Sequence, residues 1–137
     1  MNVEIAPGQS LEAKGTEECA MFGNGFWLEQ KLNGEVMGQP LRNHSFLGYD
    51  PLQKQYRAVG VDAMNPHMTL QGGTFDPETK TMEMKFSGFD AMTNRMVEGK
   101  AIERWVDDDT RKTEVWVPAP NGGDLVKFVE LTYTRVK

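Results

Sequence analysis

The sequence predicts an all-β fold, an antiparallel up-and-down barrel or half-barrel of about eight to nine strands. Almost no stretch has the i, i+3, i+4 apolar spacing of a helix, whereas many short runs alternate apolar with polar residues or are rich in Val, Thr, Phe and Tyr. Turn-forming pairs such as Asn33-Gly34 and Asp76-Pro77 recur at short intervals between these runs. Such short connections favour antiparallel neighbours, because a parallel neighbour needs a long crossover.

The turn signals divide the chain into nine expected strands. The boundaries are set by Asn33-Gly34, Gly48-Tyr49-Asp50-Pro51, Asn65-Pro66, Asp76-Pro77-Glu78-Thr79, Asp90-Ala91-Met92-Thr93-Asn94, Asp107-Asp108-Asp109-Thr110 and Pro120-Asn121-Gly122-Gly123. The expected strands are residues 9–19, 25–33, 35–48, 55–64, 67–75, 80–88, 95–106, 112–118 and 125–136.

The strand expected over residues 80–88 indicates most plainly which side chains face the interior. Met82, Met84 and Phe86 alternate with Glu83 and Lys85, so the first three are predicted to point inward and the other two toward water. The last strand is apolar on both faces, which favours a central or barrel-closing position. With no helix to cover it, the sheet must cover itself as a barrel or a sandwich, and the short connections favour an up-and-down barrel.

Composition indicates the class of protein. The 137 residues fit one domain, expected over residues 1–137. The net charge of −5, without any basic block, argues against a nucleic-acid partner. The apolar runs are far too short to span a bilayer, so no membrane partner is predicted. The N-terminus has neither a basic leader nor an apolar stretch, and we expect a soluble, cytoplasmic protein.

The single cysteine, Cys19, has no partner within the chain. Neighbouring carboxylates should raise rather than lower the pKa of its thiol, which favours an inert cysteine. No Cys/His cluster offers the four ligands of a structural zinc site, and Asp107-Asp108-Asp109 lacks the spacing of a calcium loop. We therefore predict neither a metal nor a cofactor.

Two histidines are the weak candidates for chemistry. A hairpin could bring Asp62 near His67, and such a pair could act as general base and orienting group. The favoured alternative is that Asp62 and Asn65 cap the turn while His67 lies at the surface or the barrel rim. His44 lies in a polar strand segment, and the sequence identifies no partners that would make it a metal or haem ligand.

Methionines and inward charges are the candidates for a lining. Met64, Met68, Met82 and Met84 belong to a methionine-rich middle of the chain, which could line an adaptable apolar pocket or fill an ordinary core. Charged residues alternate along residues 95–106, so some must point inward. We expect Arg104 to pair with Glu98 or Glu130 inside the barrel, where such a pair could anchor the polar head of a ligand.

Several short motifs occur in a shared order and spacing. They are Met37-Gly38-Gln39-Pro40, Gly48-Tyr49-Asp50, Gly73-Thr74-Phe75-Asp76, Thr79-Lys80-Thr81, Asp107-Asp108-Asp109-Thr110 and Thr132-Tyr133-Thr134-Arg135. With these motifs the sequence resembles the bacterial domain-of-unknown-function family 1579 over residues 15–137. The resemblance implies a lipocalin-like, calycin-type β-barrel and supplies no reaction.

Two departures from the family pattern have consequences. The chain starts at Met1-Asn2-Val3-Glu4-Ile5, part-way through the first strand of the family, which implies an incomplete barrel with an unpaired edge. A second copy could cover such an edge, so we predict a homodimer. Gly60 stands where the family tends to carry a large aromatic residue. If Gly60 faces inward, a cavity of ring size follows.

Three functions remain open at this point, in the following order. The first is a binding barrel for a small apolar or amphipathic molecule, the second a self-associating module with a filled core, and the third a hydrolase or isomerase using Asp62 and His67. The cavity is expected to open at the end where Asp62, Asn65 and His67 lie. The predicted ligand-binding residues are Tyr56, Gly60, Asp62, Met64, Met68, Met82, Met84 and Arg104.

Overall fold

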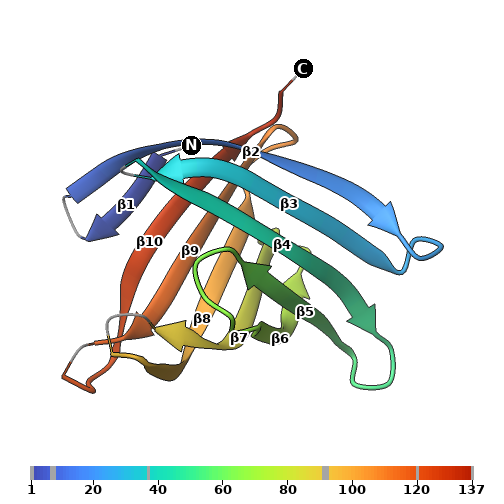
Figure 1. Ribbon diagram of the computed structural model, residues 1–137. Coiled ribbons are helices and arrows are strands. Elements are labelled where there is room, and N and C mark those ends of the chain that lie inside the picture. Colours follow the sequence, from blue (N-terminus) through green and yellow to red (C-terminus); the bar gives the residue numbers. More distant parts are fainter. Residues whose placement is uncertain (1, 7–8, 37, 91–92, 120, 137) are drawn as a thin grey trace.

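The computed structural model describes residues 2–6, 9–36, 38–90, 93–119 and 121–136, with the backbone alone up to residue 13. This part of the chain is all β and contains ten strands (Figure 1). They are β1 (Asn2–Ala6), β2 (Gln9–Phe22), β3 (Trp27–Val36), β4 (Gln39–Asp50), β5 (Gln55–Asp62), β6 (Thr69–Asp76), β7 (Thr81–Asp90), β8 (Arg95–Trp105), β9 (Thr110–Pro118) and β10 (Leu125–Thr134).

Each strand pairs antiparallel with its neighbours in the chain, so the sheet is an up-and-down meander curled into a barrel. The predicted fold class is confirmed. The short strand β1 was not predicted, and it pairs with β10 on one side and β2 on the other. The N-terminal segment therefore lies within the sheet, where the sequence predicted an unpaired edge.

The turn between β2 and β3 explains why β2 extends to Phe22, beyond the predicted end at residue 19. Gly23, Asn24 and Gly25 all have positive φ, of 66°, 60° and 82°. Glycine and asparagine adopt this left-handed region most readily. The hairpin therefore turns only after Phe22, and Figure 1 shows its tip projecting beyond the rest of the sheet.

The alternating strand directions define two ends of the barrel. The connections that follow β2, β4, β6 and β8 lie at one end, here called the Asp107 end after the turn that follows β8. The connections that follow β5 and β7 lie at the opposite end, here called the Asp62 end.

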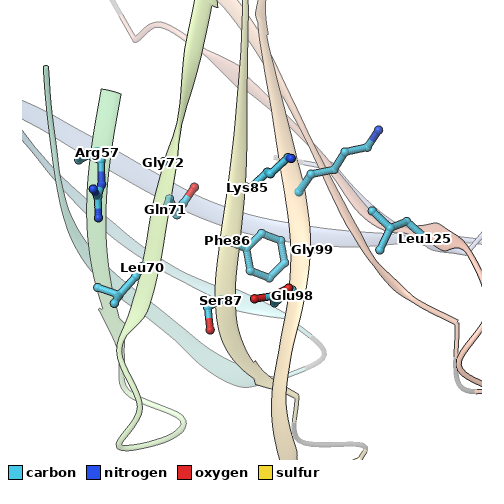
Figure 2. A pocket seen from close by; sticks show the side chains of 11 residues that line it. Arg57, Leu70, Gln71, Gly72, Lys85, Phe86, Ser87, Glu98, Gly99 and Leu125 are labelled. Carbon is cyan, nitrogen blue, oxygen red and sulfur yellow. The ribbon is translucent and has the colours of Figure 1, made fainter. Parts of the chain in front are cut away.

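The core is centred on β7. Met82 and Met84 are 5% and 4% exposed, and they are the buried apolar residues among the side chains that the structure describes. Their predicted inward orientation is confirmed. Phe86 follows on the same face, and its ring lies beside Gly99 of β8 (Figure 2). A Cβ at Gly99 would lie only 2.6 Å from Cζ of Phe86, so the ring occupies the space that a side chain would need.

The last strand, β10, has neighbours on both sides, β9 and β1, as its apolar character predicted. Its apolar side chains are nevertheless exposed at the start of the strand, where Leu125, Val126 and Phe128 are 37%, 44% and 45% accessible. In the described ranges no helix is long and apolar enough to cross a membrane.

The orientation of β7 gives a direct test of the fold. Met84→Asp places a charge in the buried layer and should lower the free energy of unfolding by several kcal/mol, whereas Glu83→Ala on the outer face should change it by less than about 0.5 kcal/mol. Urea denaturation of both variants measures the difference. Equal losses in the two variants would mean that the faces are reversed.

Candidate functional site

The pairing register places a group of polar side chains inside the barrel. Residues directly opposite each other on antiparallel strands share a face, and alternate residues along a strand share it too. Met82 is opposite Glu103 in β8, which puts Glu103 and then Trp105 on the inner face. Trp105 is opposite Arg111 in β9, and Arg111 is opposite Tyr133 in β10.

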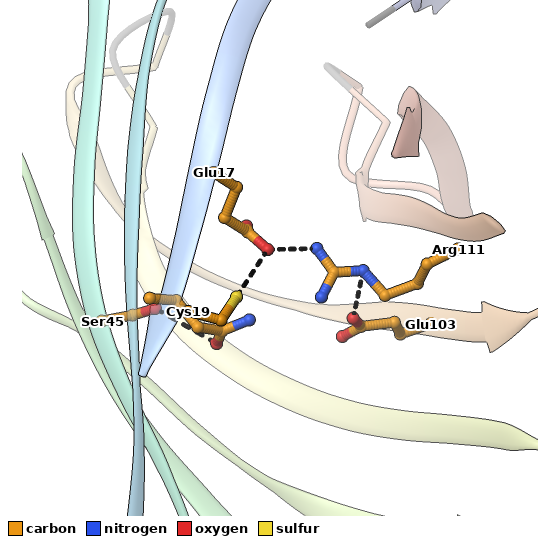
Figure 3. Close-up of polar contacts among 6 residues, drawn as sticks. Glu17, Cys19, Ser45, Glu103 and Arg111 are labelled. Carbon is orange, nitrogen blue, oxygen red and sulfur yellow. Dashed lines mark hydrogen bonds and ion pairs between the residues drawn. The ribbon is translucent and has the colours of Figure 1, made fainter. Parts of the chain in front are cut away.

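An ion cluster, the Arg111 cluster, crosses the interior between strands that are not neighbours (Figure 3). Nη2 of Arg111 lies 2.5 Å from Oε1 of Glu17 in β2, and Nε of Arg111 lies 2.8 Å from Oε1 of Glu103. The three side chains are 13% to 21% exposed. The guanidinium also lies 4.2 Å from the ring centroid of Tyr133, a cation–π contact.

The buried Nε of Arg111 is an ion-pair partner without a hydrogen bond. Its N–H is not directed at the Glu103 carboxylate, although the two groups are close enough for a strong charge interaction. Two carboxylates facing one guanidinium leave the cluster with an excess negative charge when both are ionised. Burial raises the pKa of Glu103, and this effect exceeds the opposing effect of the Arg111 charge.

Cys19 borders this cluster on β2. Its Sγ donates a hydrogen bond to Oε1 of Glu17 over 3.3 Å. Burial, followed by the negative charge of Glu17, raises the pKa of the thiol to about 11. Cys19 is therefore a neutral thiol at neutral pH, in keeping with the predicted inert cysteine, although the carboxylate responsible is Glu17 rather than an adjacent residue.

A cavity of about 490 Å³ opens beside the cluster at the Asp107 end. Leu32, Trp105 and Tyr133 give it apolar and aromatic walls. Glu17, Cys19 and Arg111 lie in its wall, and the Asp107–Asp109 turn is at its rim. The cavity thus combines an apolar wall with a small set of charged groups, as sites for small molecules do.

The predicted pair of Asp62 and His67 does not form. Oδ1 of Asp62 accepts hydrogen bonds from the backbone N–H groups of Met64 (2.7 Å) and Asn65 (3.2 Å), which is the turn-capping role of the favoured alternative. The His67 ring stacks on Phe89 with centroids 4.4 Å apart. Within the described chain no hydrogen bond joins Asp62 to His67.

The expected interior pair of Arg104 with Glu98 or Glu130 is wrong. Arg104 and Glu98 are exposed on the outer face of β8, and Glu130 pairs with Lys127 over 3.1 Å. Strand alternation places Glu103, the next residue in β8, on the inner face instead. The interior cation is Arg111, which the sequence analysis did not single out.

The remaining predicted ligand-binding residues are dispersed. Met82 and Met84 are buried, whereas Met64 and Met68 are 69% and 61% exposed near the Asp62 end. Tyr56 faces inward against Tyr49, with ring centroids 5.1 Å apart. Gly60 is also inward and buried, and a Cβ there would lie 3.5 Å from Cβ of Ser45. The cavity at the Asp107 end is lined by none of these residues, and their binding role stays a prediction.

His44 lies on the outer face, where its Nε2 is 2.8 Å from Oε1 of Glu29 and its ring contacts Phe46. Among the residues whose placement is described, no group of three His, Cys, Asp or Glu side chains could hold a metal ion.

The raised pKa of Cys19 gives a pH-dependent test of this environment. Iodoacetamide should alkylate native Cys19 with a pH midpoint near 11, and Glu17→Gln should lower the midpoint because it removes a negative charge beside the thiol. Glu18→Gln, on the opposite face of β2, is the matched control. Identical pH profiles for the folded protein and the protein in urea would contradict the assignment.

The comparison with protein families agrees with this all-β architecture and extends the expected resemblance to the N-terminus. No curated protein matches the chain. The family model described as "Protein of unknown function (DUF1579)" matches residues 1–135, nearly the whole chain, and the chain belongs to this family.

Proposed function

We propose that this protein is a non-catalytic binding barrel for a small amphipathic molecule, which enters at the Asp107 end. The observation that carries the proposal is the cavity of about 490 Å³ next to the Arg111 cluster. Its volume lies in the usual range for small-molecule sites, roughly 300 to 1,000 Å³.

The interior has room for a guest because its core is sparse. Met82 and Met84 are the only buried apolar side chains in the part of the chain described with side chains. The inward aromatic residues at the Asp107 end, Trp105 and Tyr133, are only half-buried and border the cavity. A ligand chain placed against them would remove apolar surface from water, which is the main source of affinity for such a molecule.

The charges around the cavity favour a neutral or cationic head group over a carboxylate. Glu17 and Glu103 already neutralise Arg111, and they leave excess negative charge at the cluster. The rim adds the Asp107–Asp109 turn, against which Arg135 contributes one cation, 3.8 Å from Asp109. A ligand carboxylate would meet net repulsion, whereas an ammonium group could sit near Glu17 and the ring of Tyr133.

The separation of Asp62 from His67 supports binding rather than catalysis, because a general base needs its orienting group within hydrogen-bond reach. A cytoplasmic location stays part of the proposal, and the single unpaired Cys19 supports it.

Three ligands with the same chain test the binding proposal. Octylamine, octanol and octanoate differ only in the head group, and calorimetric titration should give the tightest binding for octylamine and the weakest for octanoate. Glu17→Gln should reduce the preference for octylamine over octanol roughly fivefold, which corresponds to about 1 kcal/mol. Glu18→Gln should leave that preference unchanged. Binding of none of the three would refute the binding barrel, and tightest binding of octanoate would refute the head-group assignment.

Self-association as a homodimer is the second candidate, and it is supported by the exposed apolar surface. The accessible surface is 9479 Å², whereas a compact monomer of 15.4 kDa has about 7,200 Å². Apolar side chains are concentrated at the tip of the β2–β3 hairpin, where Met21, Phe22, Phe26 and Trp27 are 63%, 55%, 72% and 41% exposed. Contact with a second copy could cover this tip.

Light scattering tests the dimer. The wild type should have twice the 15.4 kDa monomer mass at micromolar concentration, and Phe22→Ser with Phe26→Ser should shift it to the monomer mass. Leu52→Ser is the control, since Leu52 is 93% exposed in a different turn. A wild type that is monomeric would contradict the dimer, and a dimer that persists in the double variant would exclude the hairpin tip as its interface.

A further inference from the structure

A row of cations crosses the outer face of the sheet. Arg57 of β5 is opposite Gly72 of β6, Gly72 is opposite Lys85 of β7, and Lys85 is opposite Lys100 of β8. The row continues from Lys100 to Trp116 of β9. No acidic residue occupies any of these positions, although the chain as a whole carries a net charge of −5.

A groove of about 420 Å³, the Arg57 groove, runs along this row (Figure 2). Leu70, Phe86 and Leu125 give it apolar contacts. Gly72 contributes no side chain, and this leaves the groove open between β5 and β7. The Arg57 side chain lies across that position, because a Cβ at Gly72 would be 3.5 Å from both Cδ and Nε of Arg57.

The groove has an excess of positive charge. Arg57, Lys85 and Lys100 line it together with a single acid, Glu98. In the described part of the chain Lys85 has no ion-pair partner. Nζ of Lys100 lies 5.4 Å from the ring centroid of Trp116, and Nη1 of Arg57 donates to Oε1 of the neutral Gln53 over 2.7 Å.

The direct opposition of Lys85 and Lys100 is unfavourable, since like charges on facing residues of a sheet repel each other. A bound anion would remove this repulsion. Three cations and one carboxylate leave two positive charges, which match the two negative charges that a phosphate monoester carries above its second pKa near 6.

We infer that the Arg57 groove binds the phosphate of a small organic phosphate monoester, with Arg57, Lys85 and Lys100 around the phosphate and Leu70 and Phe86 against the organic part. Arginine and lysine both bind phosphate through charge-assisted hydrogen bonds. The groove opens on the outer face of the sheet and shares no lining residue with the cavity at the Asp107 end. This inference therefore stands apart from the proposed function.

Phenyl phosphate is a suitable probe, and benzyl alcohol supplies the ring without the phosphate. In proton–nitrogen correlation spectra, phenyl phosphate should shift the amide signals of residues 70–72 and 98–100 in a saturable way at millimolar concentrations. Benzyl alcohol should leave those signals in place. Shifts without saturation, or shifts centred on other strands, would overturn the inference.

Matched lysine variants separate a specific site from general charge attraction. Lys85→Gln and Lys100→Gln should each weaken phenyl phosphate binding roughly three- to fivefold, the range expected for an exposed charge contact. Lys112→Gln makes the same change of charge at an exposed position of β9 that is opposite Arg104, outside the row. Unchanged affinity in Lys112→Gln would support the site, whereas an equal loss in all three variants would overturn it.

Discussion

The ion bridge from Glu17 through Arg111 to Glu103 is the contact on which the interior depends. It joins β2 to β9, two strands that are separated in the sheet by β1 and β10, and so it links walls that backbone hydrogen bonds do not link directly. Charged groups in a half-buried site need partners, because desolvation penalises an unpaired charge heavily. The bridge therefore fixes how closely β2 approaches β9 and what kind of cavity remains beside it.

The sparse core is the counterpart of this polar interior. A barrel of about eight strands can be filled by side chains or hold one small ligand, and additional strands widen it. Here the tight packing is confined to Met82, Met84 and the ring of Phe86 against Gly99. The Asp107 end is lined instead by half-buried aromatic and charged groups. Close packing on one wall and open space at one end are what a binding barrel requires of a single sheet.

The two faces of the same strands carry opposite charge. Alternation sends Glu103 inward from β8 and the neighbouring cation Lys100 outward, so the inner face is acidic near Arg111 while the outer row from Arg57 to Lys100 is basic. Because side-chain direction has a period of two residues, one register fixes both faces at once. A shift of one residue would reverse the two surfaces.

The sequence by itself determined the all-β class, most strand boundaries and the inward direction of Met82 and Met84, because period and turn chemistry are local properties. The capping of the turn by Asp62 was within its reach for the same reason. The tertiary structure decided that Glu103 and Arg111, rather than Arg104, form the interior pair and that Glu17 joins them from 94 residues away. Alternation predicts that some charge in β8 must point inward, but the partner depends on which strands face each other across the closed sheet. That arrangement is set by register and curvature over the whole chain, and no local pattern encodes it.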